Sequence, residues 1–122
     1  MSRTEALNST LAQIQSSSAD VEACAVVSED GLIIASSLPA NIEETSVAGM
    51  SAAMLSMGTR TAMELKRGQL DLLFIKGDNG YLLIKNAGPH AVLLAMARKE
   101  AKLGLIFLDI TRGAQRVQEI LG

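Results

Sequence analysis

The chain has 122 residues, a net charge of −2 and 48% apolar residues. This length predicts one domain, 1–122, that is large enough to bury its own core, and the apolar content excludes a disordered chain. The charges are dispersed and the only aromatic residues are two phenylalanines and one tyrosine. The basic stripe and stacking aromatics of nucleic-acid-binding proteins are therefore missing.

The first residues, the lengths of the apolar runs and the cysteine count bear on where the protein acts and on whether it holds disulfides or metals. The start, MSRTEALNST, lacks the apolar core of a secretory signal, and no apolar run is long enough to span a membrane. We therefore expect a cytoplasmic protein that binds no membrane. A single cysteine excludes an internal disulfide, and one cysteine with one histidine does not make a usual zinc ligand set. No metal or other cofactor is predicted.

The first predicted elements are a helix and a β-hairpin. The helix, residues 2–17, begins at Ser2, which forms a capping-box pair with the glutamate three residues later. The apolar runs 23–28 and 32–37 flank Asp30-Gly31, a turn signal between paired antiparallel strands. The apolar face of the helix is formed by Leu7, Leu11 and Ile14.

Residues 41–67 are predicted to form a long helix with two apolar faces. Asn41 with the glutamate three residues later resembles a capping box, Lys66 and Arg67 suit the negative end of the helix dipole, and Gly68 is the expected stop. One apolar face contains Val47, Met50, Met54, Met57, Thr61 and Leu65. The other contains Ala48, Ala52, Leu55, Thr59, Ala62 and Met63.

A narrow polar strip, here called the polar wedge, completes this helix: Ser46, Ser56, Arg60 and Glu64. A helix packed on one core needs a single apolar stripe, so a second stripe indicates cover by another subunit. The alternative is that this stripe, mostly Ala and Thr, faces water; Leu55 and Met63 favour a partner because they are large. The methionines fit an adaptable binding surface or the core, and at helical spacing we assign them to the core.

The rest of the chain predicts three strands and a last helix. Residues 69–76, 81–86 and 90–97 form a meander, with turns at 77–80 and at Gly88-Pro89. The runs of consecutive apolar residues in these strands indicate that both faces of the sheet are covered. The helix, residues 101–121, is expected to use an apolar face of Leu103, Ile106, Phe107, Ile110, Ala114, Val117 and Leu121, and Gly113 weakens it slightly.

The order helix, two strands, helix, three strands, helix predicts a three-layer α/β domain with five antiparallel strands. If the third strand lies at the sheet edge, it is a ready pairing site. With the second apolar face of the long helix, this strand predicts a homodimer. The expected interface residues are Ala48, Ala52, Leu55, Thr59, Ala62, Met63, Leu72 and Phe74.

No catalytic or nucleotide-binding motif is found. Gly77-Asp78-Asn79-Gly80 lacks the Lys-Ser/Thr of a P-loop and is interpreted as a hairpin turn. His90 has no motif that would supply a nucleophile and a supporting carboxylate, so it is expected at a strand end on the surface. Cys24 is expected in the core, and Asp109 as a solvated carboxylate.

Four stretches carry a family resemblance. They are AVVSEDGLIIASSLP (25–39), the Ala/Met-rich helix leading into Lys66-Arg67-Gly68-Gln69, LLFIKGDNGYLLI (72–84) and EAKLGLIFLDI (100–110). In this order they resemble the Roadblock family, which includes the dynein light chain Roadblock and the bacterial and archaeal MglB-type proteins. The resemblance spans essentially the whole chain.

The resemblance implies a non-enzymatic homodimer in which the middle helices pack together and the third strands join the two sheets. It also implies regulation of a small Ras-like GTPase of the MglA type, with the chemistry residing in the GTPase. We expect that partner on the polar wedge, and the resemblance does not favour Arg60 as an arginine finger. The alternatives are a dimeric scaffold or adaptor without effect on hydrolysis and, less favoured, a small-molecule sensor or enzyme.

Overall fold

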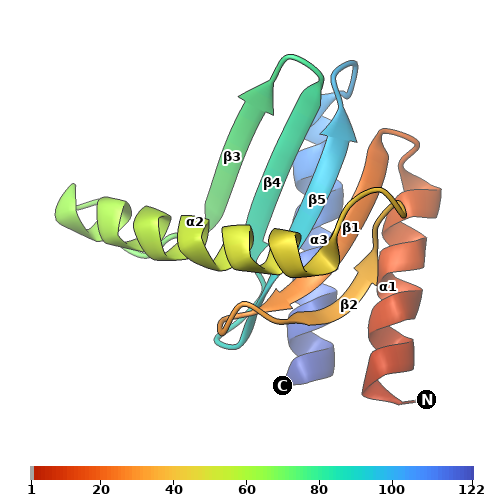
Figure 1. Cartoon of the computed structure of the whole chain (residues 1–122), viewed down its shortest axis with the longest axis horizontal. Coiled ribbons are helices and arrows are strands. Elements are labelled where there is room, and N and C mark those ends of the chain that lie inside the picture. Colours follow the sequence, from red (N-terminus) through yellow and green to blue (C-terminus); the bar gives the residue numbers. More distant parts are fainter. Residues whose placement is uncertain (1) are drawn as a thin grey trace.

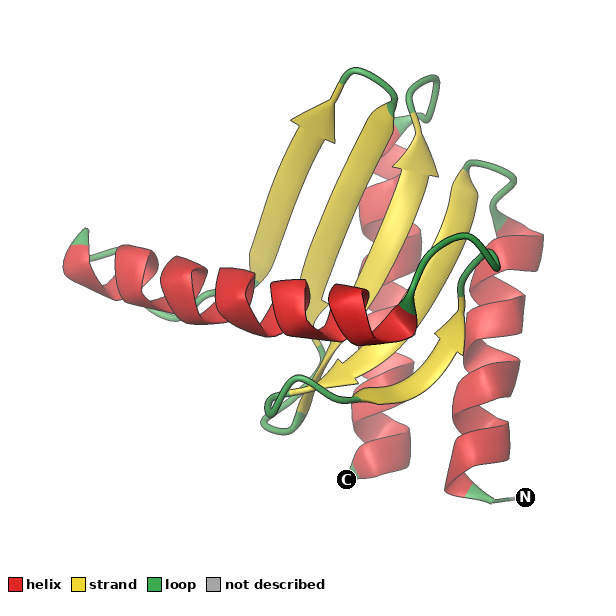
Figure 2. Cartoon of the chain, in the orientation of Figure 1, coloured by secondary structure: helices red, strands yellow, loops and turns green. Residues whose placement is uncertain are grey.

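A five-stranded antiparallel sheet lies between helices on both of its faces (Figures 1 and 2). The computed structural model describes residues 2–122. Helices α1 and α3 cover one face and α2 crosses the other, which confirms the predicted three-layer α/β fold. The elements are α1 (Arg3–Ser17), β1 (Val21–Ser28), β2 (Ile33–Ser37), α2 (Glu44–Glu64), β3 (Leu72–Gly77), β4 (Gly80–Asn86), β5 (Ala91–Arg98) and α3 (Leu103–Leu121).

The strand order is β2-β1-β5-β4-β3. The predicted hairpin β1–β2 joins the predicted meander β3-β4-β5 through antiparallel pairing of β1 with β5, in which Ala25 lies opposite Leu94. Gly31 adopts a φ of +79° in the first hairpin turn, a conformation that a residue without a Cβ adopts at no steric cost. This topology leaves β2 and β3 as the two edge strands, so the edge position on which the predicted strand pairing depends is confirmed for β3.

The alternation of side chains along the strands builds two cores. Val26 and its neighbour Val27 are both fully buried but point to opposite faces of the sheet. The core under α1 and α3 includes Leu7, Leu11, Leu83, Leu93, Ile106 and Ile110. The core under α2 is smaller and includes Ala25, Val47, Ala48, Ile84 and Leu94. Within residues 2–122, no helix is both long and apolar enough to cross a membrane.

The N-terminal cap of α1 is confirmed, but that of α2 is not where the sequence placed it. The backbone N–H of Glu5 donates to the Ser2 hydroxyl at 3.1 Å. The predicted Asn41 cap is wrong, because the backbone N–H of Ile42 donates to the carbonyl of Pro39 at 3.0 Å and holds Asn41 in a turn. Helix α2 therefore begins three residues later, after Glu43, whose side chain makes no capping bond.

The C-terminal end of α2 also differs from the prediction. The expected stop was Gly68, but the left-handed residue that ends the helix is Lys66, with a φ of +59°. Its N–H donates to the carbonyl of Met63 at 3.1 Å, and the N–H of Arg67 donates to that of Ala62 at 2.7 Å. These two bonds form a Schellman motif, which satisfies the last carbonyls without a glycine at the turning position.

Candidate protein-binding surface

The side of α2 that faces the sheet lies between the two apolar stripes predicted from the sequence. Val47, Ala48 and Ser51 are buried there, and Met54 and Leu55 pack half-buried beside them. Both stripes carry apolar residues at helical spacing. Periodicity therefore could not predict that the residues facing the sheet form a line centred on Ser51, between the two stripes. Two residues predicted for the dimer interface, Ala48 and Leu55, thus contact the chain's own sheet.

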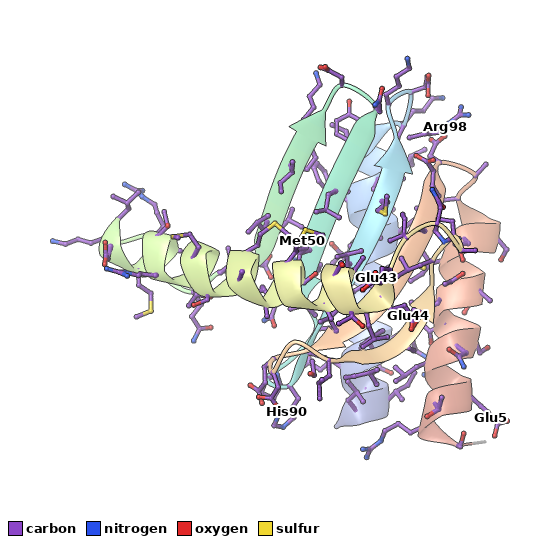
Figure 3. The ribbon with its side chains drawn as sticks, viewed as in Figure 1. Glu5, Glu43, Glu44, Met50, His90 and Arg98 are labelled. Atoms are coloured by element: carbon purple, nitrogen blue, oxygen red, sulfur yellow. The ribbon has the colours of Figure 1, made fainter. Side chains whose placement is uncertain are left out.

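Several residues of the predicted core stripe are exposed. Met50 is 58% exposed on the flank of α2 (Figure 3) and Met57 is 67% exposed, so their assignment to the core of this chain is wrong. Gly58 of α2 still lies close to Leu73 of β3, since a Cβ built on it would be 3.1 Å from Leu73 Cδ1. The C-terminal end of α2 that follows projects beyond this edge strand (Figure 1). Met63 and Leu65, both in this region, are also about two-thirds exposed. Clustered exposed apolar side chains of this size mark binding surfaces.

Strand β3 presents its side chains to both faces of the sheet. Leu72 packs on the core under α1 and α3, and the Phe74 ring lies 5.6 Å from Tyr81 and 5.8 Å from Phe107 between ring centroids. Leu73, in contrast, packs toward α2. The predicted interface residues of β3, Leu72 and Phe74, therefore lie on the α1 and α3 side of the sheet. Those of α2 lie on the opposite side, and the edge of β3 separates the two groups.

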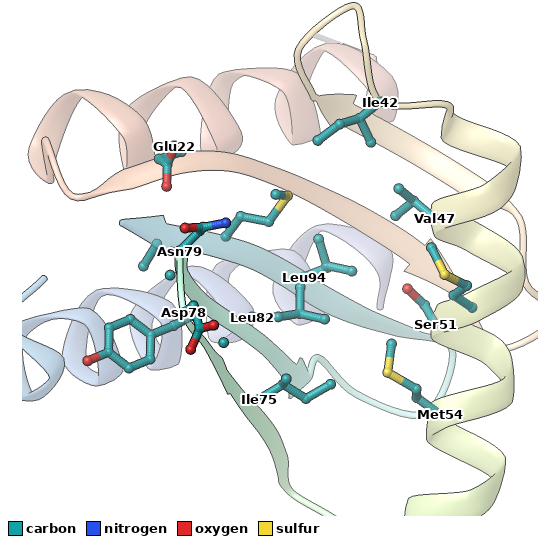
Figure 4. A pocket seen from close by; sticks show the side chains of 16 residues that line it. Glu22, Ile42, Val47, Ser51, Met54, Ile75, Asp78, Asn79, Leu82 and Leu94 are labelled. Atoms are coloured by element: carbon teal, nitrogen blue, oxygen red, sulfur yellow. The ribbon is translucent and has the colours of Figure 1, made fainter. Parts of the chain in front are cut away.

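A cavity of about 580 Å³ opens between α2 and the strands that α2 leaves uncovered (Figure 4). Ser51 belongs to its wall, and this fully buried hydroxyl has no hydrogen-bond partner among residues 2–122. Glu22 and Asp78 add carboxylates to a lining that is otherwise mainly apolar. The main apolar side chains are those of Ile42, Val47, Met50, Met54, Ile75, Leu82, Leu94 and Met96.

Sequence reasoning missed this cavity. The consecutive apolar residues of the strands predicted that both faces of the sheet are covered, and this holds for much of β1 and β5. It is wrong at the end of the sheet where β3 meets β4, because Ile75 is 42% exposed there. The only signal in the sequence was the large apolar residues of β3, which suit burial by a partner as well as by the chain itself.

The polar wedge lies on the outer side of α2. Ser46 and Ser56 are exposed, and the Arg60 and Glu64 side chains are 76% and 65% exposed. Arg60 Nε donates to Glu64 Oε1 at 3.0 Å, one helical turn apart. All four predicted partner-binding residues are thus accessible, and their role stays a prediction.

The other residues considered from the sequence have ordinary environments. His90 is exposed before β5, with Nδ1 3.6 Å from a Glu29 carboxylate oxygen, as expected for a surface residue. Cys24 is fully buried, which confirms its core position, and burial raises the pKa of its thiol to about 11. Asp109 is half-buried in a groove between α1 and α3. Within residues 2–122, no three His, Cys, Asp or Glu side chains are grouped as a metal site would require.

Comparisons with known proteins agree with this architecture. The Roadblock/LC7 domain matches residues 7–97. The uncharacterized protein MJ1340 of Methanocaldococcus jannaschii is 34% identical over 93 residues, which cover 76% of this chain and 81% of that protein.

Two solved structures have the same fold. Myxococcus xanthus MglB superposes with a TM-score of 0.91 at 20% identity, covering 99% of this chain and 91% of that one. A Roadblock/LC7 domain from Streptomyces avermitilis gives 0.86 at 16% identity, covering 93% and 96%. With the family match over most of the sequence, these likenesses show that the chain belongs to the Roadblock/LC7 domain family.

Proposed function

We propose that this protein is a non-enzymatic, homodimeric regulator of a small Ras-like GTPase of the MglA type and acts in the cytoplasm. The observation that carries the proposal is the placement of α2, whose C-terminal end projects beyond β3 with Met63 exposed while its polar wedge faces outward. One side of the helix is thus suited to a second copy and the other to a different protein. The fold shared with MglB supports the same assignment.

The dimer is formed by antiparallel pairing of β3 with β3 of a second copy. β3 is an edge strand with unpaired backbone groups on its outer side, and such an edge needs cover or a pairing partner. Antiparallel pairing of one strand with its own copy satisfies the two-fold symmetry of a homodimer. It also brings the projecting C-terminal end of α2 over the partner.

The GTPase binds the polar wedges presented by the paired α2 helices. The regulator positions the mobile loops of the GTPase, and the nucleotide chemistry remains in the GTPase. Arg60 is given a binding role and no catalytic one, because its guanidinium already pairs with Glu64 within the same helix. Acceleration of hydrolysis would make the protein a GTPase-activating protein.

The test is GTP hydrolysis by the MglA-type GTPase of the same source, with and without this protein, after its mass in solution has been measured. We expect acceleration by a dimer. Reversing both charges, Arg60→Glu with Glu64→Arg, keeps a pair of opposite charges within α2 but presents the opposite pattern to the GTPase. We expect this variant to remain dimeric and to bind the GTPase at least about tenfold more weakly.

A matched control uses the exposed pair on α3, Arg116 and Glu119, whose charged atoms are 3.6 Å apart. Arg116→Glu with Glu119→Arg should leave GTPase binding unchanged. Equal binding by the α2 and control variants would exclude the polar wedge as the contact surface. A dimer that binds no GTPase and does not accelerate hydrolysis would favour the scaffold alternative.

A further inference from the structure

The two phenylalanines and the one tyrosine of the chain gather at the edge strand β3, on the face of the sheet that α1 and α3 cover. Phe74 of β3 and Phe107 of α3 are still 39% and 37% exposed, and the neighbouring Leu108 is 44% exposed. These three residues are here called the edge patch. Grouped exposed side chains of this kind, aromatic ones above all, are typical of protein-binding surfaces.

We propose that the edge patches of two copies form one trough in the homodimer, and that this trough binds a single amphipathic helix of a partner protein, with acidic residues beside its apolar stripe. The inference rests on the homodimer proposed above. It concerns the face of the sheet opposite to α2, so the site is additional to the polar wedge assigned to the GTPase.

Symmetry brings the two edge patches together. Antiparallel pairing of β3 with its own copy requires a two-fold axis perpendicular to the sheet. Such an axis keeps each face of the sheet on its own side, so the two α3 helices lie on one face with the paired β3 strands between them. Leu72 and Phe74 point to this face, since Leu72 packs on the core under α3 and Phe74 contacts Phe107. Both residues, from both copies, form the floor of the trough.

The distance between the two α3 helices leaves room for one more helix. Helix α3 contacts β4 and β5, whose midline lies about 7 Å from β3 at the usual strand spacing of about 4.8 Å. Two such distances and the spacing between the paired β3 strands place the α3 axes about 19 Å apart. A helix midway between them would lie about 10 Å from each, which is close to the usual distance between packed helices.

The flank of α3 that faces the trough carries no charged residue. Phe107, Thr111 and Gln118 share this flank at helical spacing, and the last two are exposed polar residues without charge. The charged residues in the middle of α3 line a separate groove against α1: Asp109, Arg112 and Arg116. Both walls of the trough therefore suit the apolar stripe of a partner helix.

Both ends of the trough are positive. Lys76 follows Phe74 on the same face of β3, and Lys99 and Lys102 precede α3; all three are exposed and form no ion pair with another of residues 2–122. The first turn of α3 contains no acidic residue that would balance the positive end of its dipole. Glu100 lies in the same turn as the lysines, and Asp78 lines the cavity on the other face.

The two-fold axis reverses the direction of one copy, so each end of the trough receives one set of these lysines and one α3 N-terminus. The positive balance at both ends favours a partner helix that carries acidic residues. The depth of the site distinguishes such a helix from a flat lipid surface. Phe74 lies on the sheet, one layer below the outer side of α3 (Figure 2), so a membrane would meet Leu108 before it reached Phe74.

Three labelled peptides of about 18 residues serve as probes. The first carries leucines at helical spacing with glutamates on both flanks, and the second has lysines in place of the glutamates. The third has the composition of the first, with its leucines at alternating positions. We expect the first peptide to bind at one per dimer and at least about tenfold more tightly than the other two. Fluorescence anisotropy gives the dissociation constants, and native mass spectrometry gives the stoichiometry.

Two pairs of variants locate the binding site. Lys76→Glu should weaken binding of the glutamate peptide and strengthen binding of the lysine peptide, each by at least about tenfold. Arg112→Glu is the control, because it makes the same charge change on the flank of α3 that faces α1. Leu108→Ser should weaken the glutamate peptide, whereas Leu32→Ser, at a leucine that is 65% exposed in the first hairpin turn, should not. All four positions are exposed, and circular dichroism checks that each variant is folded.

The proposed function and the trough fail in different ways. If the unchanged chain is monomeric at every concentration, the homodimer is wrong and the trough with it. A dimer that accelerates GTP hydrolysis but binds none of the peptides, or all three equally, would exclude the trough and leave the proposed function in place. Equal effects of Lys76→Glu and Arg112→Glu would also exclude it.

Two further outcomes would overturn the proposal in favour of another occupant. Binding of two glutamate peptides per dimer would show that each edge patch acts alone, without a shared trough. Binding to vesicles of equal parts phosphatidylcholine and phosphatidylserine, without binding of the glutamate peptide, would identify the edge patch as a lipid-binding surface.

Discussion

Ile14 of α1 occupies the space next to Gly113 of α3 that a side chain would otherwise fill. A Cβ on Gly113 would lie 2.6 Å from Ile14 Cδ1 and 3.0 Å from Leu93 Cδ2. The sequence identified this glycine only as a residue that weakens a helix. The structure shows that its missing side chain allows α1 and α3 to approach each other over β5.

Gly113→Ala should therefore lower the free energy of unfolding even though alanine favours helices. Overpacking a filled core costs about 1–3 kcal/mol, and the gain in helix propensity offsets about 1 kcal/mol of this. Gly104 in the same helix is the matched control, because a Cβ there meets nothing within 4 Å. Gly104→Ala should raise stability by up to about 1 kcal/mol. Urea unfolding at one protein concentration measures both, and equal effects would contradict the close contact.

Cys24 should react with thiol reagents only when the chain unfolds. Burial raises the pKa of its thiol from 9.0 to about 11, so near pH 8 the folded protein holds about a hundredfold less thiolate than the unfolded chain. Its reaction with a disulfide reagent should be slower in native buffer than in concentrated urea by at least this factor. Similar rates in the two solutions would show that the thiol is accessible.

The same pKa shift predicts how stability depends on pH. Because the folded state binds the thiol proton more tightly than the unfolded state, the contribution of Cys24 is complete below pH 9 and is lost as the pH rises toward 11. Cys24→Ala removes the titrating group. The stability difference between the original chain and this variant should therefore shrink across that pH range, and a constant difference would exclude the linkage.

Lys66 adopts a left-handed conformation that glycine accommodates without steric cost. Lys66→Gly should relieve part of a strain of about 1–2 kcal/mol and raise the melting temperature of the folded chain. Arg67→Gly is the control, because it removes the same charge at a position with ordinary backbone geometry. It should lower stability slightly. Both are compared in high salt, which screens the effect of the charge that each variant removes.

Met63→Asp should weaken the proposed dimer without unfolding the chain. Met63 is 64% exposed in the single chain, so the new carboxylate is solvated there and becomes buried only in the dimer. Ser56→Asp on the exposed outer side of α2 is the control and should remain dimeric. Leu55→Asp is less informative, because Leu55 is half-buried against its own sheet. An unchanged dissociation constant for Met63→Asp would place the interface elsewhere.

The sequence by itself determined the order of elements and most of the core. Local signals define strands to within three residues of their observed ends, because turn residues such as Asp30-Gly31 and apolar runs act over short distances. The buried position of Cys24 followed from the apolar run of its strand, and those of Leu7, Leu11 and Ile14 followed from helical periodicity. The four stretches that resemble the Roadblock family led to the Roadblock/LC7 domain family that the comparisons show.

Only the tertiary structure decided which side of α2 faces the sheet and where that sheet is left open. Both apolar stripes of α2 satisfy helical periodicity, and the packed line is centred on Ser51, a residue that periodicity counts as polar. The sequence predicts that α2 is capped by Asn41 and stopped by Gly68. In the structure, a turn at Pro39 and a Schellman motif at Lys66 set the two ends of the helix instead. The cavity combines side chains from α2 and from the strands β1, β3, β4 and β5, and no local pattern encodes how much of these four strands one helix covers.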